Sequence, residues 1–197
     1  MRILAAYLVF CLFYLGAAAI DLRPPQLLQP SLIDRAIPFL PWTIAVYLSQ
    51  FAFLFLTLRW QRDARVYVPM AVATLISCAI FVLYPTTIAR PAVDSAAFDG
   101  LWLFDVPENC FPSLHVSLAI IAAAYWPRAR WIGIAWAIAI AVSTMTTKQH
   151  YFVDVAGGIA MGFLTTLPLL RDRRATSSPP RASPAQSDAP PLRAPRE

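Results

Sequence analysis

The chain has only two histidines, His115 and His150, and each lies in a short polar stretch beside an apolar run. His150 precedes Asp154 by four residues, a spacing that puts both side chains on one face of a helix and within reach of each other. An aspartate that accepts a hydrogen bond from one imidazole nitrogen fixes the tautomer and makes the other nitrogen a better nucleophile or base. The pair is a candidate nucleophile with its orienting group. An aspartate that merely satisfies a buried histidine explains the spacing alone equally well.

The second polar stretch, residues 112–115, reads Pro-Ser-Leu-His and has the composition of a helix start. Pro112 suits the first turn, and Ser113 is able to cap the helix or to donate to a ligand. Free backbone N–H groups at such a start favour a phosphate, and His115 would stand close to that anion. An ordinary capped membrane helix with one interfacial histidine is the simpler explanation of this stretch taken alone.

Two cations complete the polar set. Arg90 lies in a loop otherwise rich in acidic residues, and Lys148 lies two residues before His150. A guanidinium clamps phosphate oxygens with two parallel hydrogen bonds, and an ammonium adds a point charge. Cations of this kind also commonly reach to a membrane interface. Taken together, the stretches predict a phosphate-chemistry site with His150, His115 and Asp154 as catalytic candidates and Arg90, Lys148 and Ser113 as phosphate-binding candidates.

Six apolar runs of 16 to 19 residues must position these groups: residues 3–20, 42–58, 66–84, 111–126, 131–147 and 152–170. A helix needs ~20 residues to cross the hydrocarbon core of a bilayer. Hydrophobic residues make up 58% of the 197-residue chain and the mean hydropathy is +0.57, whereas only 14% of residues are charged. This composition excludes a disordered protein, a disulfide-stapled secreted domain and a soluble nucleic-acid binder. It predicts an all-α polytopic membrane bundle of six transmembrane helices.

The charges between the runs predict the orientation of the bundle. One side carries nine basic and two acidic residues, and the other side carries four basic and seven acidic residues. The positive-inside rule therefore puts both termini in the cytoplasm and the polar stretches on the opposite face, which in a bacterial inner membrane is the periplasmic one. Residues 1–170 are predicted to form the membrane domain. Residues 171–197, rich in proline and arginine, are predicted to form a disordered cytoplasmic tail.

The first apolar run has an alternative interpretation as a cleaved signal peptide, because Arg2 precedes it and three alanines, residues 17–19, lie near its end. Its 18 apolar residues exceed the ~7–15 of such a peptide. Cleavage would not change the side on which the other loops lie. The three cysteines have no CxxC spacing, and the role of Cys110 is open.

At these residues the sequence resembles the type 2 phosphatidic acid phosphatase superfamily, six-helix membrane relatives of the vanadium haloperoxidases. The second family block, Pro-Ser-Gly-His, matches residues 112–115 except at Leu114. The third block matches Ser143, His150 and Asp154, with Thr144 in place of the family arginine. The first block matches residues 90–91, with Leu83 in place of the family lysine. Lys148 is placed to supply one of the two missing charges.

Residues 111–115 and 148–151 are more similar in sequence to the inositol phosphorylceramide synthase branch, which transfers a phospho-headgroup between lipids. The resemblance implies that His150 attacks phosphorus to give a phosphohistidine, that Asp154 orients it, and that His115 protonates the departing lipid oxygen. Arg90, Lys148 and Ser113 would neutralise the phosphate oxygens. The expected partners are a membrane lipid phosphate and an acceptor, either water or a lipid or polyol hydroxyl. No cofactor, metal or nucleic acid is implied, and the oligomeric state is not indicated.

Two other function classes remain open. A membrane metalloprotein would use His115, His150 and Asp154 as ligands, but the positive charges of Arg90 and Lys148 argue against a cation there. A non-catalytic lipid transporter or scaffold would keep the same fold. An intact nucleophile and orienting pair counts against that class, because a transporter does not need one.

Overall fold

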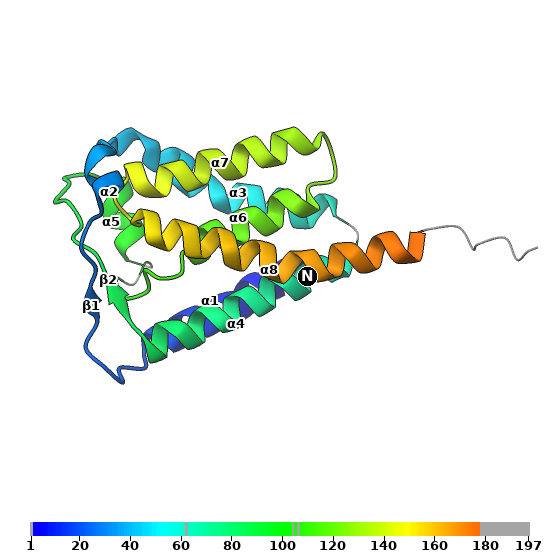
Figure 1. Cartoon of the computed structure of the whole chain (residues 1–197), viewed down its shortest axis with the longest axis horizontal. Helices are drawn as coiled ribbons and strands as arrows, with labels where there is room; N and C mark the ends of the chain where they lie inside the picture. Colours follow the sequence, from blue (N-terminus) through cyan, green and yellow to red (C-terminus); the bar gives the residue numbers. More distant parts are fainter. Residues whose placement is uncertain (1, 62, 104, 106, 178–197) are drawn as a thin grey trace, which may run out of the picture.

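The computed structural model of the chain describes residues 2–61, 63–103, 105 and 107–177 (Figure 1). The described part is mostly helical, as predicted, and each of the six apolar runs forms most of one helix. In chain order the elements are α1 (Arg2–Ala18), β1 (Gln26–Leu27), α2 (Leu32–Ala36), η1 (Pro41–Thr43), α3 (Ile44–Trp60), η2 (Ala64–Val66), α4 (Tyr67–Leu83), β2 (Thr86–Thr87), α5 (Ala96–Trp102), α6 (Leu114–Tyr125), α7 (Arg130–Thr146) and α8 (Phe152–Ser177).

Helix α6 forms the centre of the bundle and packs against α3, α4, α7 and α8. Its side chains are mostly small or branched apolar groups, and most of them are buried. At the periphery, α1 packs on α4 and α3 packs on α7. The core around α6 includes the fully buried side chains of Phe53, Ile121 and Ile140. The two histidine-bearing segments are therefore attached to the best-packed part of the molecule.

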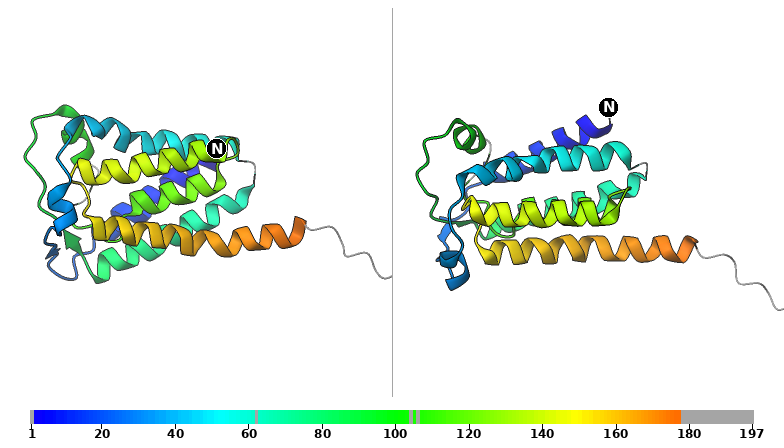
Figure 2. Two further views of the ribbon diagram at one scale, coloured as in Figure 1. Left: turned by 45° about the horizontal axis from the view of Figure 1, so that its top comes forward. Right: turned by 90° about the horizontal axis from the view of Figure 1, so that it is seen from above.

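The short elements gather at one end of the bundle. There α2, α5 and the two strands cover the ends of the long helices (Figure 1), and β1 pairs with β2 in parallel. At this end α6 and α8 begin and α7 ends, whereas the start of α1 and the end of α8 lie toward the opposite end (Figure 2). Because six helices alternate in direction, polar stretches that are distant in sequence come together.

Two helical segments, Pro41–Trp60 and Ala64–Leu83, are long and apolar enough by length and composition to cross a membrane. Four further apolar helices are shorter: Arg2–Ala18, Leu114–Tyr125, Arg130–Thr146 and Phe152–Pro168. Helix α6 is shorter than its apolar run because Ser113 caps it after Pro112 and because Pro127 follows its C-cap, Trp126.

Helix α8 continues to Ser177, so the predicted boundary at residue 170 falls inside a helix. Residues 171–177 include three arginines and one alanine, and both residue types favour helical backbone. The remaining part of the predicted tail, residues 178–197, lies outside the described residues.

Glycines let α8 approach α6 closely. A Cβ atom added to Gly158 would lie 2.5 Å from the carbonyl oxygen of Ser113, and one added to Gly162 would lie 2.7 Å from the Cβ of Ile120. Side chains larger than hydrogen do not fit at these distances. Because glycine has no side chain, Gly158 and Gly162 allow the first turns of α8 to lie against α6.

We expect Gly158→Ala to lower the free energy of unfolding by about 1–3 kcal/mol, because the added methyl group overpacks a rigid backbone contact. Thermal unfolding of the detergent-purified protein measures the change. Gly16→Ala is the matched control, since an added Cβ there meets nothing within 4 Å. Equal melting temperatures for the two variants would contradict the close-packing interpretation.

Candidate active site

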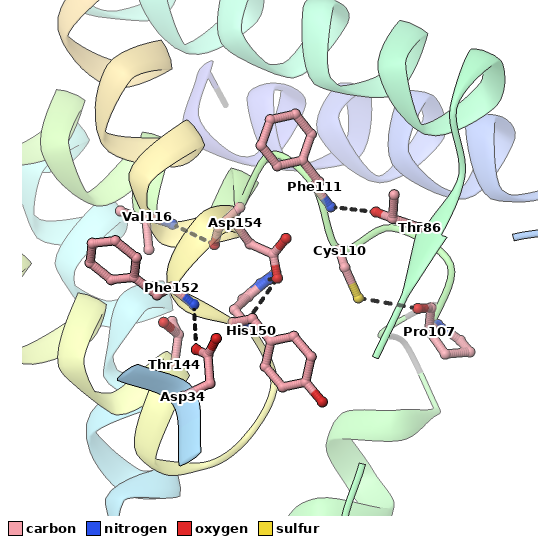
Figure 3. Close-up of polar contacts among 12 residues, drawn as sticks. Asp34, Thr86, Pro107, Cys110, Phe111, Val116, Thr144, His150, Phe152 and Asp154 are labelled. Carbon is pink, nitrogen blue, oxygen red and sulfur yellow. Dashed lines mark hydrogen bonds and ion pairs between the residues drawn. The ribbon is translucent and has the colours of Figure 1, made fainter. Parts of the chain in front are cut away.

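The turn between α7 and α8 carries His150 and leads into Asp154. His150 precedes the first helical residue of α8, yet its Nδ1 lies 3.7 Å from Oδ2 of Asp154 (Figure 3). Asp154 is fully buried, and its Oδ2 also accepts a hydrogen bond of 2.8 Å from the Tyr151 N–H. The carboxylate thus holds the first turn of α8 and faces the imidazole at the same time.

The pair has unused hydrogen-bonding capacity. Nδ1 of His150 and Oδ1 of Asp154 are both buried and have no hydrogen-bond partner in the described structure. Leaving a buried polar group unpaired costs about 1–3 kcal/mol. The separation of 3.7 Å exceeds a hydrogen bond, and catalytic hydrogen bonds without substrate are often long and tighten in the complex.

Ser113 joins the start of α6 to α8. Its Oγ accepts a hydrogen bond from the Val116 N–H at 3.4 Å and caps α6, while its own N–H donates to the Asp154 carbonyl at 3.0 Å. The side chain is fully buried. Of the two roles that the sequence allowed for Ser113, the structure shows capping. A serine hydroxyl that accepts in this way keeps its O–H for a second partner.

His115 is held by α3. Its Nε2 lies 3.0 Å from the carbonyl oxygen of Tyr47, and its ring stacks on the Tyr47 ring with the centroids 4.0 Å apart. A carbonyl oxygen only accepts, so we assign a hydrogen to Nε2. Nδ1 is then the nitrogen that carries a hydrogen only in the protonated ring.

Both histidines line one cavity of about 650 Å³. Side chains of α1, α3, α4 and α6 form its mainly apolar walls, and its polar lining includes Gln50, Asp105 and Asn109. Cavities of this size and lining are typical of small-molecule sites. Hydrocarbon walls that lead to two imidazoles suit a ligand with an apolar chain and a polar head.

The two candidate cations have protein partners. Arg90 Nη2 donates to Oδ2 of Asp105 at 2.7 Å, and Asp105 in turn lines the cavity. Lys148 Nζ donates to the carbonyl oxygens of Asp34 at 2.8 Å and Ile37 at 2.6 Å, at the C-terminal end of α2. The structure therefore places both histidines on one cavity, with Asp154 beside His150 and Ser113 bonded to the Asp154 backbone. Arg90 pairs with an acid that lines the cavity, whereas Lys148 contacts α2.

Residues 39–167 match the family model described as the PAP2 superfamily. The chain belongs to the PAP2 superfamily. Membership points to a phosphatase-type enzyme, in a family that is membrane-associated and acts on lipid phosphates. No curated protein sequence and no solved structure gives a significant match to the chain. The resemblance read from the sequence is thereby confirmed at the level of the superfamily, and the synthase-like branch stays a prediction.

Two polar residues that line the cavity of this PAP2 chain were not identified from the sequence. Gln50 donates through Nε2 to the carbonyl of His115 at 3.1 Å, and its Oε1 is buried without a partner in the described structure. Asn109 Nδ2 is likewise buried and unpaired there. An amide in the middle of the apolar run 42–58 was the available signal for Gln50, because polar groups are costly in a membrane helix. Asn109 had no signal beyond its place before residues 110–115.

Cys110 of the PAP2 chain follows the cavity-lining Asn109, and its surroundings favour the protonated thiol. Burial, reinforced by the negative charge of Asp154, raises the pKa of the Cys110 thiol to about 12, so the thiol stays protonated at neutral pH. It donates to the Pro107 carbonyl at 3.3 Å.

Among the residues that the structure describes, no three His, Cys, Asp or Glu side chains form a group that could hold a metal ion.

Proposed function

We propose that this PAP2 protein is an integral membrane enzyme that cleaves or transfers the phospho group of a lipid phosphate through a phosphohistidine on His150. One observation carries the proposal: His115 and His150 line the same apolar cavity of about 650 Å³, with Asp154 buried against His150. The hydrocarbon chain of a lipid phosphate suits the apolar walls of this cavity, and its anionic head suits the part of the cavity that the two histidines line.

The proposed enzyme has six membrane-spanning helices, both termini in the cytoplasm and the site on the opposite face. Large apolar side chains on the outside of the long helices support this placement, since Leu12 is 71% exposed and Leu164 is 70% exposed. Aqueous surfaces rarely expose extended apolar areas. Helices shorter than the hydrocarbon core are accommodated by local thinning of the bilayer or by flanking residues. The proposal that both termini face the cytoplasm rests on the arginine distribution in the loops.

In the first proposed step, Nε2 of His150 attacks phosphorus and the bond to the lipid oxygen breaks. His115 enters this step protonated on both ring nitrogens, a form that the anionic phosphate beside it favours. The proton on Nδ1 goes to the lipid oxygen, and the hydrogen on Nε2 stays hydrogen-bonded to the Tyr47 carbonyl oxygen. The Asp154 carboxylate stabilises the positive charge that develops on His150. In the second step, Nδ1 of His115 takes a proton from water as the water oxygen bonds to phosphorus and the P–N bond breaks. A lipid or polyol hydroxyl in place of water gives transfer.

Arg90, Ser113 and Asn109 are the proposed donors to the phosphate oxygens. The Arg90 guanidinium is already paired with Asp105, so a bound phosphate has to share it or displace that carboxylate. Asn109 offers a buried Nδ2 donor that has no partner in the described structure. Positioning and charge stabilisation of this kind carry most of phosphoryl transfer. Lys148 is left out of this set because its ammonium binds α2 carbonyls.

The test is turnover by purified protein in detergent, with chelator present, on phosphatidic acid, lysophosphatidic acid, ceramide phosphate and a polyprenyl phosphate. We expect release of inorganic phosphate or, with an added lipid or polyol hydroxyl, a new phospholipid. Activity that requires a divalent metal would favour the metalloprotein alternative. Lipid transport without turnover, unaffected by His150→Ala, would favour the transporter or scaffold.

A further inference from the structure

Asp34 caps a helix that lies 118 residues further along the chain. Its Oδ1 accepts a hydrogen bond of 2.6 Å from the N–H of Phe152, the first residue of α8 (Figure 3). Its Oδ2 accepts from the N–H of Ser31 at 2.8 Å and from the Ser31 hydroxyl at 2.6 Å, which completes a capping box on α2. With only 5% of its surface exposed, Asp34 joins two helix starts through one buried carboxylate.

Lys148 makes the reciprocal connection. Its Nζ donates to the carbonyl oxygens of Asp34 and Ile37, two groups at the end of α2. Lys148 has a φ of 54°, a left-handed conformation that costs a non-glycine residue about 1–2 kcal/mol. Such strain persists only where the surroundings hold it, and the two carbonyl contacts do so.

His150 lies between these two attachment points. Lys148 is two residues before it, and Phe152 is two residues after it. The backbone N–H of His150 donates to the Thr144 carbonyl at 3.1 Å, which ties the turn to α7. Helix α2 therefore fixes the turn from outside the α7–α8 hairpin, at one point on each side of the imidazole.

The charge of the Asp34 carboxyl suits this role. Burial alone would raise its pKa, but the hydrogen bonds from Ser31 and the Phe152 N–H and the positive charge of Lys148 outweigh burial and lower it. The Asp34 carboxyl is therefore ionised at neutral pH. Its negative charge is lost only as the pH falls through the lowered pKa. An anion at a helix N-terminus is also favoured by the helix dipole.

We infer that Asp34 is a positioning residue for His150, and that Asp34 and Lys148 together form a clamp that sets where the imidazole stands relative to the cavity. Helix α2 precedes residues 39–167, so half of the clamp comes from outside the segment that matches the family model. The part of the inference that concerns catalysis rests on the proposed function. The part that concerns the turn does not, because the order of the turn is measurable without a substrate.

Two measurements on Asp34→Leu test the clamp. Amide hydrogen exchange over residues 147–155 should be at least ~10-fold faster than in the wild type, because the cap on Phe152 is lost. Turnover on the active lipid phosphate should fall about 10²-fold in kcat with KM within twofold, since a misplacement of 1 Å has an effect of that size. Asp34→Asn keeps an oxygen acceptor without the charge, so it should fall between Asp34→Leu and the wild type in both measurements. Arg35→Gln, at the next and exposed position of α2, is the matched control and should match the wild type.

Unchanged exchange over residues 147–155 in Asp34→Leu would overturn the clamp. Faster exchange throughout all the helices in both Asp34 variants would also overturn it, because Asp34 would then support the bundle as a whole. An equal loss of kcat in Asp34→Leu and Arg35→Gln would do the same. If the wild type turns over no lipid phosphate, the proposed function fails, and the exchange measurement still decides whether Asp34 orders the turn.

Discussion

His150→Ala should reduce turnover of the lipid phosphate by at least ~10³-fold while the helical bundle stays folded. The imidazole forms the covalent intermediate in the proposed reaction, and in the described structure it has no close substitute, because the Cys110 thiol is protonated and hydrogen-bonded to Pro107. His150 lies in a turn rather than in the packed centre around α6, so its loss should leave the melting temperature nearly unchanged.

The intermediate gives a second measurement on the same variant. A short reaction with a substrate labelled at phosphorus should leave label on the wild-type protein that is lost in acid and kept in base, as expected of a phosphohistidine. His150→Ala should carry none. Label that survives acid, or that persists in His150→Ala, would assign the nucleophile to another residue. Partial rescue of His150→Ala by added imidazole would show that the variant keeps the rest of the site intact.

Asp154→Asn should lower kcat by about 10²–10⁴-fold, the second largest effect that we expect. The amide keeps the shape of the carboxylate and an oxygen that accepts from the Tyr151 N–H, so the first turn of α8 should survive. It removes the negative charge that lies 3.7 Å from Nδ1 of His150 and that stabilises the imidazole as it becomes positive. Phosphohistidine formation should slow, and KM should change little.

Asp99→Asn is the matched control, since Asp99 is an exposed carboxylate on α5 at the same end of the bundle. The same chemical change there should leave kcat within twofold of the wild type. If Asp154→Asn behaves like Asp99→Asn, then Asp154 merely caps the turn and does not act on His150. Single-turnover measurements in the two variants separate the chemical step from product release.

Local spacing was enough to predict the helices and some short-range contacts among the candidate site residues. The apolar runs overlap the long helices, and local signals such as Ser113 and Pro127 mark where α6 begins and ends. His150 and Asp154 lie close together because only four positions separate them, although His150 lies in the turn before α8 and not on the helix face that the spacing predicted. Ser113 caps α6, which depends only on the residues around it. In each case the contact lies within about one helical turn, so the chain itself brings the groups together.

The partners of the long cationic side chains of Lys148 and Arg90 were not predictable in this way. Lys148 was expected to bind phosphate, yet its ammonium lies on carbonyls of α2, more than 100 residues away. Arg90 was expected to be free for a phosphate, yet it pairs with Asp105. A flexible cation takes whichever anion or carbonyl group the fold brings within reach, and sequence spacing does not encode that distance.

The sequence by itself determined a helical PAP2 chain with its two histidines and their aspartate at one end, because apolar runs and short spacings act locally. Only the tertiary structure decided the rest. It formed a cavity between α1, α3, α4 and α6 that both histidines line, it placed Gln50 and Asn109 there, and it set α2 as a clamp on the α7–α8 turn. These features arise from packing between segments distant in the chain, and such packing depends on the whole arrangement of helices.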